Sequence, residues 1–206
     1  MSGCRETIDS IISIEWDMFT AVNEGEPRAA CQDDKATFQW MRGAQFDAWS
    51  AGAATSYLND LESALREKRN LAEEKYIHMM KDTAPAEYRG LLTRITPPSD
   101  HAVTLAQSIS DIMLSQTREL FDEYPFLSGH GRPLYSELDS FTTSVETYQL
   151  SELLTYSEAT LASLKDHVLA LEGEGISIAR TILENTVRFY GYESLDDAEA
   201  AAKSRG

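Results

Sequence analysis

Apolar residues recur at helical spacing along most of this 206-residue chain, and this periodicity constrains the fold more than any other feature. No segment between turn signals shows the alternation of polar and apolar residues that is typical of a β-strand. Only 6 prolines and 11 glycines interrupt the chain. The sequence therefore predicts an all-α fold, a helical bundle of about eight helices with two long central helices and one long irregular loop.

Capping residues and helix breakers set the expected helix bounds. Helices are expected over residues 6–22, 36–68, 70–82, 86–93, 100–123, 143–171 and 176–190, before a short last helix capped by Ser194. Asp33 or Asp34 can cap the second helix, which Gly43 or Gly52 could bend. Thr143 and Glu146 form a capping box. Residues 124–140 are the longest irregular stretch, and such loops tend to carry function.

We expect a single all-α domain over residues 1–206, which could divide into two helical-hairpin halves, about 1–95 and 99–206. Residues 45–65 weakly resemble residues 149–169, and each stretch precedes a tight turn and a further helix. The identity is too low to establish a duplication, because two helical hairpins in one bundle share this pattern.

The composition is acidic. The chain has 18 Lys+Arg against 34 Asp+Glu and a formal net charge of -16. Binding to nucleic acid needs a positive surface, and so does binding to an anionic membrane surface, so neither is expected. No apolar run approaches the length of a membrane span, and the N-terminal residues lack the apolar core of a signal peptide. We expect a cytoplasmic protein.

The sequence offers little metal or nucleophile chemistry. Cys4 and Cys31 form no CxxC pair, and no Glu-x-x-His occurs, so no metal site is predicted. Glu74 and His78 are four residues apart, but they fall on the polar side of their helix and are expected to be solvated. Cys31 lies beside Asp33 and Asp34, which oppose thiolate formation. No cofactor is identified.

Polar side chains interrupt the apolar faces of two predicted helices. Phe38, Met41 and Trp49 share one face, and Arg42 and Gln45 lie among them. Glu15 interrupts the face formed by the isoleucines of the first helix. A buried carboxylate must be paired, hydrated or protonated, and an arginine fork matches it. We therefore expect Glu15 to meet Arg42 and Gln45.

The helix after Thr143 places Tyr148, Glu152 and Tyr156 on successive turns, opposite its leucine-rich face. Such a column indicates either the polar wall of a cavity or a second packing surface. Asp60 continues the polar pattern of the second helix. Arg132, in the irregular stretch, could hold an anion or cover a pocket.

Several long strings resemble the bacterial domain of unknown function 4125 family. They are EWDMF, CQDDKATFQWMRGAQFDAWS, SYLNDL, RNLAEEKYIHMM, YPFLSGHGRPLYSELDS, SVETYQLSELLTYS and RFYGYESLDDAE, which together span nearly the whole chain. The resemblance supplies no activity and no catalytic residue. It adds Tyr57 to the candidate residues, and it implies a helper role, since some members accompany nucleotidyltransferase-like proteins.

Two hypotheses follow. In the first, the protein binds a small, anionic molecule between helices, with or without catalysis. Glu15 and Glu152 are then the acid–base candidates, because burial raises carboxylate pKa values toward neutrality. The ligand-binding residues of this hypothesis are Arg42, Gln45, Trp49, Tyr57, Asp60, Arg132, Tyr148 and Tyr156. In the second, the protein is a structural or partner-binding module, and the same groups fix helix register. The sequence does not predict an oligomeric state.

Overall fold

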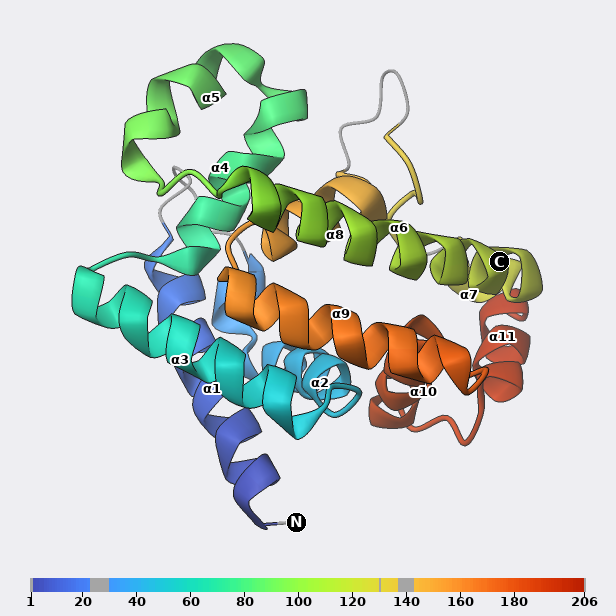
Figure 1. Cartoon of the computed structure of the whole chain (residues 1–206). Coiled ribbons are helices and arrows are strands. Elements are labelled where there is room, and N and C mark those ends of the chain that lie inside the picture. The colour runs from blue at the N-terminus through green and yellow to red at the C-terminus, as the bar shows by residue number, and fades with distance from the viewer. Residues whose placement is uncertain (1, 23–29, 130, 137–142, 206) are drawn as a thin grey trace.

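The computed structural model describes residues 2–22, 30–129, 131–136 and 143–205, and it confirms the all-α prediction (Figure 1). These residues form eleven α-helices rather than about eight, with two short 3₁₀-helices and no strand. The α-helices are α1 (Ser2–Ala21), α2 (Lys35–Phe46), α3 (Ala51–Glu67), α4 (Leu71–Thr83), α5 (Pro85–Leu91), α6 (Asp100–Glu123), α7 (Pro125–Ser128), α8 (Val145–Leu153), α9 (Glu158–Gly173), α10 (Ile178–Phe189) and α11 (Leu195–Lys203). The 3₁₀-helices are Ala30–Asp33 and Leu92–Arg94.

Both long helices predicted from the sequence are broken, and this accounts for much of the larger helix count. The segment predicted as one helix over 36–68 is α2 and α3, and the segment over 143–171 is α8 and α9. A serine caps the second helix of each pair. Ser50 Oγ accepts from the backbone N–H of Ala53, and Ser157 Oγ accepts from that of Thr160, both at 3.2 Å. Gly43 and Gly52 lie inside helices and cause neither break.

Other predicted caps are partly confirmed. Asp34 caps α2 and Ser194 caps α11, as expected. Ser144, rather than Thr143, caps α8, because its hydroxyl accepts from the N–H of Thr147 at 3.1 Å. The predicted irregular stretch contains the short helix α7, and its residues 130 and 137–140 lie outside the described part of the chain.

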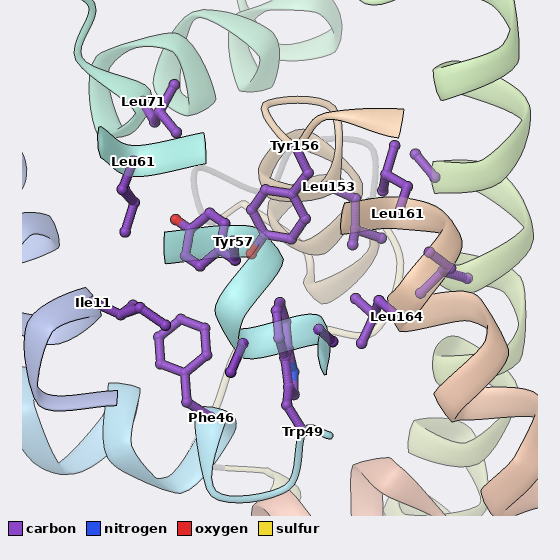
Figure 2. Packing of buried hydrophobic residues seen from close by; sticks show 14 of the residues in the cluster. Ile11, Phe46, Trp49, Tyr57, Leu61, Leu71, Leu153, Tyr156, Leu161 and Leu164 are labelled. Atoms are coloured by element: carbon purple, nitrogen blue, oxygen red, sulfur yellow. The ribbon is translucent and has the colours of Figure 1, made fainter. Parts of the chain in front are cut away.

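The main core lies where α1, α3, α6 and α9 meet (Figure 2). Its completely buried side chains include Ile11, Phe46, Leu61 and Leu161. A smaller cluster joins the end of α6 to α10 and α11. There the Glu199 carboxylate accepts the backbone N–H groups of residues 126 and 127, at 3.0 and 2.7 Å, and so ties α11 to α7.

Two burial predictions are wrong. Met41 was expected on the apolar face of its helix, but 45% of it is exposed. Glu74 and His78 were expected to be solvated, but both are buried. The physical reason is that α4 packs against α1, α5 and α8, so its sides are covered by three different neighbours. Glu74 pairs with Arg69, whose two guanidinium N–H groups donate to its two oxygens at 2.8 Å.

Candidate functional site

Arg42 of α2 lies at the centre of a polar network. Its Nε and Nη2 donate to the two carboxylate oxygens of Glu15 on α1, at 2.6 and 2.5 Å. Its Nη1 donates to Gln45 Oε1 at 2.8 Å and to Glu152 Oε1 of α8 at 3.0 Å. The predicted meeting of Glu15 with Arg42 is thus confirmed, and the partner of Arg42 is a protein carboxylate. Gln45 reaches the network through Arg42 and Glu152.

Glu152 is the second acceptor centre of the network. Its Oε1 also accepts from Gln45 Nε2 at 3.0 Å and from the Tyr156 hydroxyl at 2.8 Å. Its Oε2 accepts from Lys75 Nζ of α4 at 2.6 Å. The Tyr57 hydroxyl of α3 donates to Glu15 Oε1 at 2.7 Å. Five helices therefore meet through charged hydrogen bonds, which are the stronger kind.

Tyr148 extends the network toward the surface. Lys75 Nζ lies 3.5 Å from the centroid of its ring, and Arg132 Cζ lies 4.7 Å from the same centroid. Cations attract the negative face of an aromatic ring at such distances. Arg132 is exposed, whereas Lys75 is largely buried, with 12% of its side chain accessible. Contacts thus lead from exposed Arg132 through Tyr148 and Lys75 to buried Glu152.

Arg132 is positioned because the irregular segment 132–136 is held against the start of α8. The backbone N–H groups of Val145 and Glu146, at the start of α8, donate to the carbonyl oxygens of Pro133 and Leu134, at 2.9 and 3.2 Å. Arg132 Nη1 donates to the carbonyl oxygen of Thr143 at 3.1 Å. These bonds fix the segment along the start of α8. They also occupy helix N-terminal N–H groups that would otherwise be available to an anion.

The charges of the network are almost balanced. Arg42 and Lys75 face Glu15 and Glu152, whose side chains are each 11% accessible. Arg132 forms no ion pair with any described residue. The cluster including Arg132 therefore carries an excess positive charge, although the whole chain has a net charge of -16.

The network shifts the pKa values of Glu152, Tyr57 and Tyr156. Burial alone would raise the pKa of Glu152, but the nearby charges of Arg42 and Lys75 and hydrogen bonds from Lys75 and Gln45 outweigh it and hold that pKa well below its usual range. The expectation that burial brings this carboxylate toward neutrality is therefore wrong. Burial and neighbouring Glu15 raise the pKa of Tyr57, and burial and Glu152 raise that of Tyr156, so both hydroxyls remain donors.

Two predicted ligand-binding residues, Trp49 and Asp60, have clear structural roles. Trp49 is buried, with its ring 5.1 Å from Phe46 and 5.9 Å from Tyr156 (Figure 2). Asp60 Oδ2 accepts from the backbone N–H of Ser157 at 2.9 Å and stabilises the turn before α9. Tyr57 and Tyr156 lie beside Trp49 (Figure 2), with ring centroids 4.5 Å apart, and their hydroxyls donate to Glu15 and Glu152 of the network.

Lys75 is the principal site residue that the sequence prediction missed. It falls between Ala72 and Met79 on one side of α4, where it interrupts apolar residues as Arg42 does on α2. That interruption was the available signal. Among the described residues, no group of three or more His, Cys, Asp and Glu side chains could hold a metal ion. A cleft of about 210 Å³ lies elsewhere, between α10 and the start of α11, and is lined in part by Arg180 and Asp196.

Comparison with protein-family models places residues 5–200 in a single match, to a protein family of unknown function, DUF4125. The chain belongs to the DUF4125 family. The match covers nearly the whole chain and includes every residue of the network. No curated protein and no solved structure matches the chain. No helix among the described residues of this DUF4125 member has the length and apolarity required to cross a membrane.

Proposed function

We propose that the protein binds a small anionic molecule at the outer end of the polar network, where Lys75 and Arg132 meet at Tyr148. The observation that carries the proposal is that two cations contact one half-buried ring in a strongly acidic chain. Arg132 is exposed and has guanidinium N–H groups beyond the one that donates to Thr143, and such groups suit carboxylates and phosphates. Location in a bacterial cytoplasm stays a prediction.

Lys75 and Arg132 replace Arg42 and Arg132 as the proposed anion-binding pair. Arg42 donates four of its five N–H groups to Glu15, Gln45 and Glu152, so an incoming anion would have to displace a protein acceptor. Lys75 donates one of its three N–H groups to Glu152, which leaves donors for an anion. The rigid network beneath Tyr148 instead supports the site by holding Lys75 in place. Fixed supporting groups of this kind are what precise ligand binding requires.

The electrostatics favour binding over acid–base catalysis. A general acid or base works best with a pKa near the working pH. Glu152 has its pKa held far below that range by Arg42 and Lys75. Glu15 accepts from both Arg42 and Tyr57, so its oxygens already have donors. We therefore propose a binding protein and assign neither carboxylate a proton-transfer role.

A thermal-shift screen tests this proposal. The panel would contain inorganic phosphate, pyrophosphate, citrate, nucleotides and neutral metabolites of similar size. We expect at least one anion to raise the Tm of the wild type and to lose that effect in Arg132→Gln. The matched control is Arg118→Gln, which removes an exposed arginine on α6 and should leave the shift unchanged. Equal shifts in the two variants would refute the site.

The second candidate is a structural module in which the network fixes the register of α1, α2, α4 and α8. The direct closure of Arg42 on protein acceptors favours it. The family resemblance adds a helper role beside a nucleotidyltransferase-like protein. Glu15→Gln separates the two candidates, because it leaves Lys75 and Arg132 untouched. If that variant unfolds at lower temperature and no panel compound protects the wild type, the structural role stands alone.

A further inference from the structure

Three helices of the second half, α8, α9 and α10, follow three of the first half, α2, α3 and α4, at a constant spacing. Adding 107 to a residue number converts the end of α2 (Phe46) into the end of α8 (Leu153). The same shift converts the start of α3 (Ala51) into that of α9 (Glu158), and the start of α4 (Leu71) into that of α10 (Ile178).

The turns between these helices match in detail. Lys68, which follows α3, has a left-handed backbone with φ 59°, and its counterpart Gly175, after α9, has φ 73°. The next residue closes the turn in each case. The N–H of Arg69 donates to Ala64 O, and that of Ile176 donates to Leu171 O, both at 2.8 Å. A long helix, a left-handed turn and a second helix therefore recur with the same internal bonds.

The packing of the helices repeats as well. α1 contacts α2, α3 and α4, and α6 contacts α8, α9 and α10, so α6 takes the place of α1 in the second half. The two halves meet through α3 and α9 (Figure 1). They also meet through two further contacts that the 107-residue shift interchanges, which are α4 with α8 and α10 with α2.

Side chains at the junction are also reciprocal. Trp49 and Tyr156 are counterparts of each other, and their rings are in contact. Asp60 accepts from the backbone of Ser157, at the turn before α9. Its counterpart His167 contacts the carbonyl oxygen of Ala48, at the turn before α3, at 3.0 Å. Such exchange of equivalent contacts is the mark of a two-fold relation.

We propose that the chain consists of two copies of one four-helix unit, related by a two-fold axis between Trp49 and Tyr156, and that only one of the two equivalent inter-unit contacts carries the anion site. The units are α1–α4 and α6 with α8–α10, which develops the predicted division near residues 95–99. The assignment of a single anion to this chain rests on the proposed function. The two-unit architecture does not.

The residues that make the two contacts different can be named. At the α4–α8 contact, Lys75 meets Tyr148 and Glu152. The counterparts of these three residues are Ile182, Met41 and Gln45, none of which is charged. The counterpart of Arg42 is Gln149, which donates to Ser110 rather than to a carboxylate.

The α10–α2 contact has other interactions. Asn185 donates to the carbonyl oxygen of Ala44 at 3.2 Å, and Phe189 stacks on Trp40 with centroids 6.1 Å apart. This contact therefore holds an amide hydrogen bond and an aromatic pair, where the α4–α8 contact holds the Lys75–Glu152 ion pair and a cation–π contact. Arg188 lies near this contact, but it donates to Asn185 and pairs with Glu184. Among the described residues, two cations share one aromatic ring only at Tyr148, so one anion per chain is the consequence.

Circular permutation of the full chain tests the two units. One permutant opens the chain between Pro97 and Pro98, between units, and the other opens it between Lys68 and Arg69, inside a unit. Both join the first and last residues of this chain by the same flexible linker of roughly 20 residues. The first should melt cooperatively within about 5 °C of the wild type, and the second should lose considerably more. Equal losses, the reverse order, or failure of both to fold would overturn the two-unit account.

Backbone NMR titration with pyrophosphate tests the single site on the intact chain. Shifts confined to Lys75, Tyr148 and their neighbours are expected, with at least tenfold weaker binding in Lys75→Ile and unchanged binding in the counterpart variant Ile182→Lys. Comparable shifts around Ile182 and Met41 would refute the single site while leaving anion binding intact. If pyrophosphate and the screened anions shift neither contact, anion binding itself fails, and the permutants still decide on the two units.

Discussion

The guanidinium of Arg42 donates to Glu15, Gln45 and Glu152, so removal of one acceptor leaves a buried charge with fewer partners. Removal of the Glu152 carboxylate should cost the most stability, because Lys75 and Tyr156 also donate to it. Breaking a buried ion pair from one side typically costs about 3 kcal/mol, whereas an exposed pair is worth under about 1 kcal/mol. We expect Glu152→Gln to lose the larger amount in urea denaturation at pH 7. Glu62→Gln, at an exposed pair with Arg66, should lose the smaller amount.

The pH dependence of that difference follows from the lowered pKa of Glu152. A carboxylate with a lowered folded-state pKa contributes stability that is fully present above its unfolded pKa, about 4.5, and is lost as the pH falls toward the folded value. The gap in unfolding free energy between wild type and Glu152→Gln should therefore shrink between pH 5 and about pH 2.5. Urea titrations across this range measure it, and a gap that widens in acid would contradict the assignment.

His78 gives a second pH dependence, in a higher range. Burial and the charge of Lys81 lower its pKa from 6.5 to about 4, and its Nε2 has no hydrogen-bond partner among the described residues. The unfolded chain then binds a proton that the folded chain does not, so stability falls as the pH drops from 6.5 toward 4. Between pH 7 and pH 5 the wild type should lose about 2 kcal/mol more than His78→Leu. An imidazole NMR titration with a midpoint near 6.5 would contradict this.

At the scale of elements, a substitution of the left-handed residue after α3 can increase the stability of the protein. Lys68 adopts φ 59°, where a side chain costs roughly 1 kcal/mol relative to glycine, while its counterpart position already holds Gly175. We expect Lys68→Gly to stabilise the protein by about 0.5 kcal/mol once the greater freedom of the unfolded chain is deducted. Gly175→Ala should destabilise it by about 1 kcal/mol. Denaturant midpoints measure both changes, and opposite signs would show that these turns differ.

Element prediction succeeded where a helix had one unambiguous cap. Residues 100–123 were predicted and are α6, because the two prolines at residues 97 and 98 and then Ser99 mark its start. It failed at Ser50 and Ser157, since a serine in a periodic stretch is compatible with both an exposed helical position and an N-cap. Only the tertiary packing of Trp49 and Tyr156 in the core selects the cap.

For the site, the sequence predicted which face of its helix each polar residue occupies, but not which residues of different helices meet. Interrupted apolar faces on α1 and α2 identified Glu15 and Arg42, which do pair. Periodicity gives no information about the rotation of one helix against another, so it could not join Lys75 to Glu152. It also treated α4 as a surface helix, although three helices surround it. The pKa of Glu152 is lowered by the charges of Arg42 and Lys75, which periodicity could not place beside it, whereas burial alone would raise it.

At the scale of the whole molecule, the net charge of -16 opposes compactness, because most of the carboxylates lie at the surface and repel one another. Salt screens charges that are exposed and separated, with a Debye length of about 10 Å at 0.1 M, but hardly affects the buried network. We therefore expect the Tm to rise by roughly a few degrees between 10 mM and 0.5 M NaCl. The exposed ion pairs, such as Arg5 with Asp9, oppose this change only weakly. Scanning calorimetry at several salt concentrations measures the change. A falling Tm would mean that surface ion pairs, rather than net repulsion, dominate the electrostatics of the fold.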